Sequence, residues 1–456
     1  MFKTKRILAS IIFFLLNFLL LCSIACKKEN SRPHIIFYLL DAGRADYFGC
    51  YGQKDNLTPH MDQMAKNGVL FARHYANSFY TSGSLSNLFT GRYDFFDILH
   101  QFDDKSHKPL TPKTRKDELT SDCVLLTDLL RESGYRTIAL AANPFLTPQC
   151  ILGSSFDQCI QFDPPKKRSA ERAEVIFEEA LKIIEAQQKE NKQRPIFLYI
   201  HLMDTHAPHL PPPLFNKYRE NPPPFIHDPQ YLKLAGRAKG SMAYMDHCLG
   251  QFHQELKKAL KGNTIEIITA DHGDSYGEAG CLYHRVPSFC REEAHRIPLI
   301  ISGIPMSGKM NKIEDWTSTV DIFPTILEMI GLKSKNNFLV DGSSLTMLMQ
   351  SPKGDKRSNG VFFVLEKQCG FRKEGKTYKI QNDKLQILNE GQELFEPPTK
   401  LNDMISSLPK EFLDLRIKYL ERLVLRNKMK RTGYQERVDE TAKSRKEQLK
   451  SLGYVK

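Results

Sequence analysis

The 456-residue sequence has a single tryptophan, no cysteine pair of the CxxC type and no internal repeat. The lack of a repeat excludes a solenoid. Eight of the ten cysteines are scattered beyond residue 49, and their spacing excludes a zinc ribbon. In an exported protein, short-range pairs such as Cys150 with Cys159, or Cys281 with Cys290, could form disulfides. Buried free thiols are the alternative.

Basic residues outnumber acidic ones, and the formal net charge is +12. Much of the excess lies in residues 422–450, a stretch that resembles one or two polar helices. Nucleic acid is not an expected partner, because an exported protein would not meet it. A solvated helix face is the simplest interpretation, and attraction to an anionic lipid surface is a second one.

The amino terminus has the order of a bacterial lipoprotein signal. Lys3, Lys5 and Arg6 precede an apolar run over residues 7–21, and small residues then lead to Cys26. About fifteen apolar residues are short for a ~30 Å hydrocarbon core, which favours a signal peptide over a permanent helix. We therefore expect a signal peptide over 1–25, lipidation of Cys26 and a tether over 26–33. Plain secretion and an uncleaved anchor are the alternatives.

Apolar runs alternate with helical patterns from residue 34 to about residue 335. Strands are expected at 34–40, 137–142, 195–202, 264–270 and 297–302, and helices at 58–66, 121–132, 171–189, 235–260 and 319–330. This alternation predicts a mostly parallel sheet with helices on both faces.

The pattern changes in the last part of the chain, residues 336–456. Short strands are expected at 361–365, 377–381 and 385–388, with a helical tail from residue 409. These predict a small carboxy-terminal subdomain with an antiparallel sheet and a helical tail.

Polar side chains follow the strands of the predicted parallel sheet. Asp41 comes directly after HIIFYLL, Asp271 and His272 after TIEIITA, and His201, Asp204 and His206 at the end of PIFLYIHL and just beyond it. Open α/β sheets bind ligands at the carboxyl ends of their strands. A carboxylate after a fully apolar strand is costly unless it is paired or bound to a cation. A divalent metal site is therefore favoured over a separate helix cap and turn.

An ordered series of motifs resembles the sulfatase family. It consists of PHIIFYLLDAGRADYFGCYG, TPHMDQMAKNGVLFARHYANS, LSNLFTGR, HLMDTHAPHLPP, ITADHGDSYGE and TVDIFPTILEMIGL. The resemblance covers residues 33–345 and implies an alkaline-phosphatase-like fold, with the catalytic domain over 34–335.

The resemblance also implies roles for individual residues. Metal ligands are expected at Asp41, Asp271 and His272, and the nucleophile position falls on Thr81. Substrate contact and protonation of the leaving oxygen are expected of His206 and His284. Further substrate-binding positions are Arg44, Asn143 and His201.

Three departures from the family pattern bear on mechanism. Many sulfatases carry a second aspartate where this chain has Ala42, and an arginine where it has Leu85. The family nucleophile is a cysteine or serine that is oxidised to formylglycine. The extra methyl group of Thr81 would give a ketone, so the hydrated-aldehyde route is closed here.

We therefore expect a metal-dependent hydrolase of sulfate or phosphate esters, with one divalent ion and an anionic ester substrate. Ca²⁺ is the first expectation, with Mg²⁺, Mn²⁺ or Zn²⁺ as alternatives, because oxygen and imidazole ligands suit several ions. The expected location is the bacterial cell envelope, outside the cytoplasm, on a lipid anchor. A transferase of phospho-substituents to envelope acceptors and a non-catalytic binding lipoprotein are the rival functions.

Overall fold

The architecture comes from a computed structural model that describes part of the chain. The described residues are 32–93, 123–162, 172–189, 194–218, 229–285, 289–304, 312–332, 340–350, 360–365, 368–381, 384–389, 392, 399–400, 404, 406 and 408–430. The predicted signal peptide with Cys26, the predicted boundary at residue 335 and the tail beyond residue 430 lie outside them. Within these residues, no helix is both long enough and apolar enough to cross a membrane.

An eight-stranded sheet forms the centre of the described part, in the order β10-β2-β9-β6-β1-β5-β3-β4. Neighbouring strands are parallel, except that β9 runs antiparallel to both β2 and β6. The predicted mostly parallel sheet is confirmed. The strands are β1 (His34–Leu40), β2 (Val69–Tyr75), β3 (Arg136–Ala141), β4 (Gln158–Gln161), β5 (Ile196–Leu202), β6 (Thr264–Ala270), β9 (Leu299–Ser302) and β10 (Lys312–Ser318).

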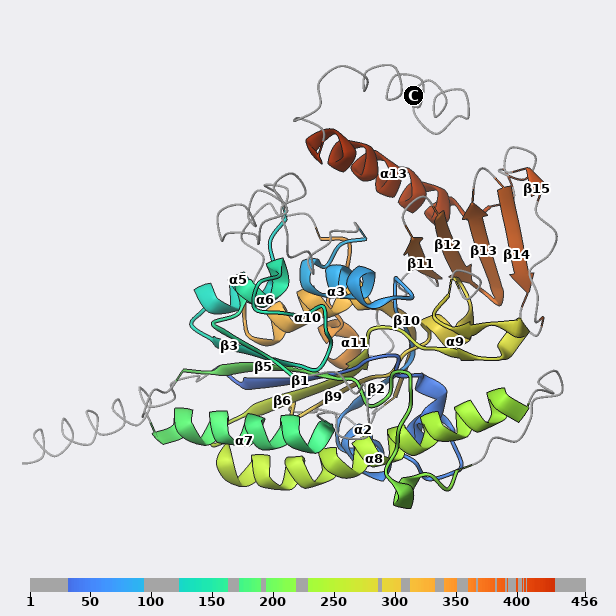
Figure 1. The fold of residues 1–456 in the computed structure, drawn as a ribbon. Helices are drawn as coiled ribbons and strands as arrows, with labels where there is room; N and C mark the ends of the chain where they lie inside the picture. Colours follow the sequence, from blue (N-terminus) through green and yellow to red (C-terminus); the bar gives the residue numbers. More distant parts are fainter. Residues whose placement is uncertain are drawn as a thin grey trace, which may run out of the picture.

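Helices cover both faces of this sheet (Figure 1). One face carries α2 (Pro59–Asn67), α7 (Ala173–Lys189) and α8 (Pro229–Ala259). The other carries α3 (Thr81–Thr90), α5 (Leu126–Glu132), α6 (Ile151–Ser155), α10 (Ile322–Met329) and α11 (Thr346–Gln350). Residues of β1 alternate between the two apolar cores that result, which explains why the strand is apolar along its whole length.

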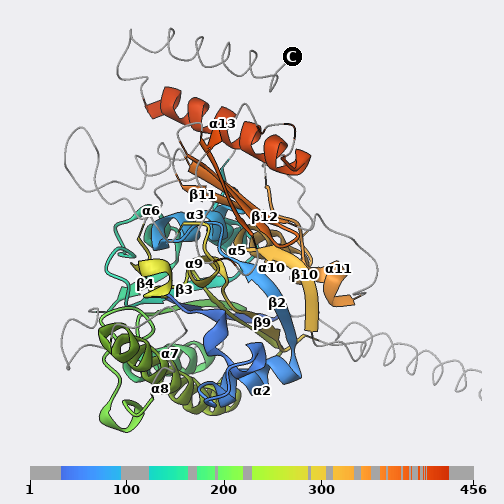
Figure 2. The same cartoon turned by 90° about the vertical axis from the view of Figure 1, so that its right-hand side faces the viewer.

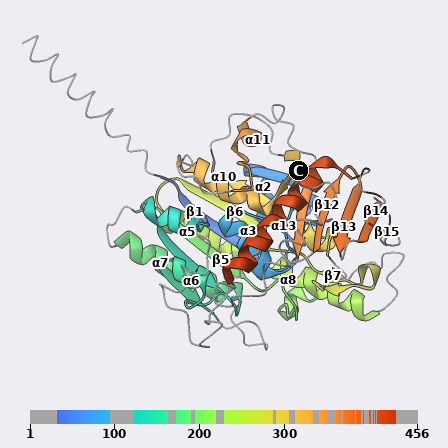
Figure 3. The same ribbon diagram turned by 90° about the horizontal axis from the view of Figure 1, so that it is seen from above.

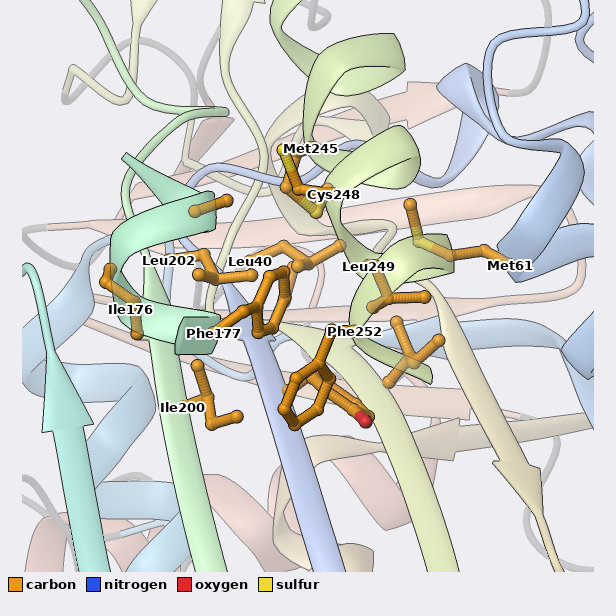
Figure 4. Packing of buried hydrophobic residues seen from close by; sticks show 14 of the residues in the cluster. Leu40, Met61, Ile176, Phe177, Ile200, Leu202, Met245, Cys248, Leu249 and Phe252 are labelled. Atoms are coloured by element: carbon orange, nitrogen blue, oxygen red, sulfur yellow. The ribbon is translucent and has the colours of Figure 1, made fainter. Parts of the chain in front are cut away.

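The core under α7 and α8 packs two phenylalanine rings among aliphatic side chains (Figure 4). Phe177 of α7 and Phe252 of α8 stack at a centroid distance of 4.6 Å, and each ring forms a T-shaped pair with Tyr38 on β1. Aromatic pairs of this kind add to the stabilisation from apolar burial. This packing fixes β1, and with it the strand end that carries Asp41.

A second, five-stranded sheet lies to one side of the core (Figure 3). It is antiparallel, as predicted, and α13 (Lys410–Lys430) lies above it, away from the core sheet (Figure 2). Phe371 and Phe412 stack between the small sheet and α13 at 5.5 Å. Its strands are β11 (Gly360–Leu365), β12 (Gln368–Lys373), β13 (Lys376–Gln381), β14 (Lys384–Asn389) and β15 (Thr399–Lys400).

Backbone pairing and a shared apolar cluster join the two sheets. Asn77, just after β2, accepts a hydrogen bond from Val364 N at 2.8 Å and donates one to Phe362 O at 2.7 Å. Phe363 packs in the same cluster as Tyr75. The small sheet is therefore held beside the segment that leads from β2 to α3.

The cysteines of the described residues carry thiols and form no disulfide. Of the two alternatives for the pairs Cys150–Cys159 and Cys281–Cys290, the structure has the thiol form. Three of these four residues are buried and Cys159 is half-buried.

Candidate active site

Three neighbouring strands bring the predicted polar residues to one edge of the sheet. β1 lies between β5 and β6 and runs parallel to both. Asp41 therefore follows β1 beside Asp271, which follows β6, and beside His201 at the end of β5. All three side chains are buried.

The carboxylate of Asp41 is oriented from one side. Its Oδ2 accepts a hydrogen bond from Asn143 Nδ2 at 2.9 Å and lies 2.9 Å from His201 Nε2. The other ring nitrogen of His201 meets the Tyr199 hydroxyl at 3.2 Å. This arrangement favours a role for Asn143 and His201 in orienting Asp41. Their predicted contact with substrate stays a prediction.

The carboxylate of Asp271 is oriented by backbone groups. Its Oδ1 accepts hydrogen bonds from Ala42 N at 3.1 Å and His272 N at 2.9 Å. Ala42 has a φ of 59°, a left-handed conformation that costs a non-glycine residue roughly 1–2 kcal/mol. Ala42 therefore contributes its N–H to the site, and its methyl group offers no ligand.

Three buried atoms face one another with the chemistry of a metal site. Asp41 Oδ1, Asp271 Oδ2 and His272 Nε2 have no hydrogen bond of normal geometry among the described residues. His272 Nε2 lies 3.7 Å from Asp41 Oδ1 and 3.5 Å from Asp271 Oδ2, and the ligand atoms all lie within 4.8 Å of one another. The other ring nitrogen of His272 contacts Gly273 O at 3.0 Å, which leaves Nε2 for an ion. The three predicted ligands thus fit one divalent cation.

Burial and neighbouring charges together set the pKa values in this cluster. Burial, and then the charge of Asp41, raise the pKa of Asp271 to about 7. Burial also raises the pKa of Asp41, but His206, His201 and His272 outweigh it and hold this pKa below its ordinary value. Burial lowers the pKa of His272, which favours the neutral ring that binds metals. A cation among these groups would favour the ionised form of both carboxylates.

Thr81 lies beside this cluster as the first residue of α3. Its side chain lies close enough to Asp271 to lower the pKa of that carboxyl, against the larger raising effects of burial and of Asp41. The first turn of α3 has no acidic residue, and its N-cap residue Tyr80 makes no side-chain cap hydrogen bond, so its N–H groups are available to an anion. A Cβ atom at Gly83 would lie 2.3 Å from Ser78 Oγ, so the turn packs closely only with glycine there.

Two histidines lie close to the same cluster. The rings of His206 and His284 are 5.4 Å apart, and the ring of His284 is 4.4 Å from that of His272. Burial lowers the pKa of His206, but Asp41 and Asp274 outweigh it and raise this pKa. The pKa of His284 is likewise raised, because its hydrogen bond to Asp274 and the charge of Asp274 outweigh burial. Both rings therefore hold a proton more readily than an ordinary histidine.

The guanidinium of Arg44 is engaged within the protein. It pairs with Asp46 at 2.7 Å and Glu278 at 2.6 Å, and it donates to Asp274 O at 3.0 Å. Its predicted contact with substrate stays a prediction. Asp274 was not among the predicted site residues, although its place as the last residue of the DHGD motif was a signal.

An open, mostly parallel sheet with acidic and histidine side chains at its strand ends, and a hydroxyl at a helix start, is the arrangement of the alkaline-phosphatase-like class of folds. A solved Vibrio parahaemolyticus protein of the alkaline phosphatase superfamily has this fold, with a TM-score of 0.60, 19% identity and coverage of 86% of this chain and 88% of that chain. The model of the sulfatase family matches residues 33–332. The chain belongs to the sulfatase family.

Curated relatives carry sulfatase names. An N-acetylgalactosamine-6-sulfatase from Rattus norvegicus is 24% identical over 367 residues, which cover 70% of this chain and 66% of the relative. An ulvan-active sulfatase from Formosa agariphila is 25% identical over 356 residues, which cover 74% of this chain and 62% of the relative. The chain thus spans slightly less than two thirds of the length of these relatives.

Proposed function

We propose that this protein hydrolyses sulfate or phosphate esters, with Thr81 as the nucleophile. The observation that carries the proposal is the position of Thr81 at the start of α3, near Asp271 in the buried cluster of Asp41, Asp271 and His272. Membership of the sulfatase family and the names of the relatives support ester hydrolysis.

Asp41, Asp271 and His272 would hold one divalent cation, for which Ca²⁺ is our first expectation. When bound, such a cation neutralises the anionic oxygens of an ester and lowers the pKa of a nearby hydroxyl. Ala42 leaves the set one carboxylate short of the pattern common in the family, so an ion such as Mg²⁺, Mn²⁺ or Zn²⁺ is an alternative.

The side chains supply the remaining steps. Thr81 Oγ1 gives up its proton to solvent and attacks sulfur or phosphorus, and N–H groups at the start of α3 stabilise the oxygens of the transferred group. The bond to the leaving oxygen breaks as His206 or His284 donates a proton to it. Water then attacks the threonine ester, releases the inorganic group or monoester and restores the hydroxyl.

A direct comparison of model substrates tests the proposal. Purified protein is supplied in turn with Ca²⁺, Mg²⁺, Mn²⁺ and Zn²⁺, and turnover of 4-nitrophenyl sulfate, bis(4-nitrophenyl) phosphate and a phenylphosphonate ester is measured. We expect metal-dependent hydrolysis of at least one of them. Metal-loaded protein that hydrolyses none of the three would favour the binding function instead.

We propose further that the protein is exported and held on the envelope by acyl chains on Cys26. The basic, apolar and small-residue order before this cysteine supports the proposal. Because a single acyl chain binds a membrane only marginally, a stable tether needs more than one chain. Cys26→Ser should move the protein from the detergent phase to the aqueous phase, whereas the matched Cys22→Ser variant should stay in the detergent phase. Mass spectrometry showing an unacylated mature terminus would refute the tether.

A further inference from the structure

We propose that Asp274 is a positioning residue that fixes the imidazole of His284 for the substrate. The inference rests on the proposed function, because it assumes that His284 serves the reaction. It adds a carboxylate that lies outside the three expected metal ligands.

A short hairpin places the two side chains opposite each other. Strands β7 (Ser275–Tyr276) and β8 (Leu282–Tyr283) pair antiparallel, with Ser275 opposite Tyr283. The next pair in this register is Asp274 and His284. Asp274 Oδ1 lies 2.8 Å from His284 Nδ1, which is the distance of a strong hydrogen bond.

The backbone of Asp274 has little freedom to move. Gly273 N donates to Ala294 O at 2.9 Å, and a Cβ atom at Gly273 would lie 2.1 Å from Glu293 O. Asp274 itself is fully buried. The carboxylate is therefore a rigid partner, and a histidine bound to it through Nδ1 keeps Nε2 for a ligand.

Arg44 ties this hairpin to the strand end that carries Asp41. Its Nη1 donates to Asp274 O at 3.0 Å and to Glu278 Oε1 at 2.6 Å, and its guanidinium lies over the Tyr276 ring at 5.5 Å. Glu278 in turn accepts a hydrogen bond from Tyr276 N. Arg44 thus fixes the position of the hairpin with His284 relative to the expected metal site.

The main alternative is that Asp274 binds a cation of its own. Ligand atoms of His272, Asp274 and His284 also lie within 4.8 Å of one another, and Asp274 Oδ2 has no hydrogen-bond partner among the described residues. However, His272 Nε2 can serve only one ion, and the carboxylates of Asp41 and Asp271 both face it. Because Asp274 already forms a hydrogen bond with His284, the geometry favours a positioning role for Asp274 over cation binding.

A double-mutant cycle separates these roles. Asp274→Asn should lower kcat/KM for bis(4-nitrophenyl) phosphate or 4-nitrophenyl sulfate by about 10–100-fold, as is typical when the carboxylate that orients a functional histidine is removed. In a His284→Gln background the same change should have almost no further effect, because Asp274 acts through His284. Metal content should equal that of the unmodified protein. Additive losses, or loss of metal in Asp274→Asn, would overturn the inference.

A second readout does not depend on activity. In protein with ¹⁵N-labelled histidine, the His284 signals are assigned by their loss in His284→Gln, and the ring shifts report which nitrogen carries a proton. We expect a proton on Nδ1 in the unmodified protein and a change of this signal in Asp274→Asn. A His284 Nδ1 without a proton in the unmodified protein would refute the positioning role of Asp274. If none of the three model substrates is hydrolysed, the proposed function fails, and the NMR result still decides this inference.

Discussion

Replacing Asp271 by asparagine should abolish metal binding while the fold persists. The amide oxygen of the new residue can still accept the hydrogen bonds from Ala42 N and His272 N. Its NH₂ group would then take the position of Oδ2, where a donor cannot bind a cation. Because a cation at about 100 times its Kd stabilises the folded state by about 2.7 kcal/mol, the variant should melt roughly 5 °C lower in saturating metal.

Elemental analysis and melting curves with and without EDTA check this result. EDTA should lower the Tm of the unmodified protein and leave that of Asp271→Asn unchanged. The matched control is Asp157→Asn, which weakens hydrogen bonds to Thr137 on β3 away from the site. The control should keep its metal and its response to EDTA, whatever its stability. An Asp271→Asn protein with a full metal content would show that the site is elsewhere.

The strands that build the site could be predicted because they are buried on both faces. HIIFYLL is apolar beyond its first residue, and five of the seven residues of TIEIITA are β-branched, so each stands out without knowledge of its neighbours. Strands β2 and β10 were not predicted, since VLFARHY and KIEDWTS mix charged residues with apolar ones. These two strands are stabilised by pairing with each other at the edge of the sheet, and this pairing does not appear in their local sequence pattern.

For the side chains of the site, the sequence likewise predicts position but not orientation. Asp41, Asp271 and His272 could be grouped because parallel strands end at one edge of a sheet. The hydrogen bonds of Asn143 and His201 to Asp41 depend on rotamers and on contacts between distant segments. The pairing of Asp274 with His284 depends on the register of a hairpin whose strands have only two residues each, and the sequence does not show this register. Position at a strand end is therefore readable from sequence, whereas orientation within the site is not.

Replacing Thr81 by alanine should remove activity without removing metal. The change deletes the hydroxyl of Thr81, whose interaction with Asp271 lowers the pKa of that carboxyl. Loss of a nucleophile commonly costs at least about 10³-fold in kcat, and we expect a loss of that size. Thr81→Ser keeps the hydroxyl and should retain measurable turnover. Equal activity in Thr81→Ala and the unmodified protein would show that the nucleophile is another residue, and Ser82→Ala is the next variant to assay.

The identity of the nucleophile also predicts a preference among substrates. A threonine ester must be cleared by attack of water at sulfur or phosphorus, because Thr81 cannot form the aldehyde that expels sulfate in formylglycine enzymes. Sulfate monoesters thus lose the special advantage of the family, whereas phosphoryl groups can use an ordinary covalent intermediate. We therefore expect kcat/KM for bis(4-nitrophenyl) phosphate or a phosphonate ester to exceed that for 4-nitrophenyl sulfate. Both activities should fall together in Thr81→Ala. Sulfate hydrolysis that persists after phosphodiester hydrolysis is lost would mean that the two reactions use different nucleophiles, which would contradict the single route through Thr81.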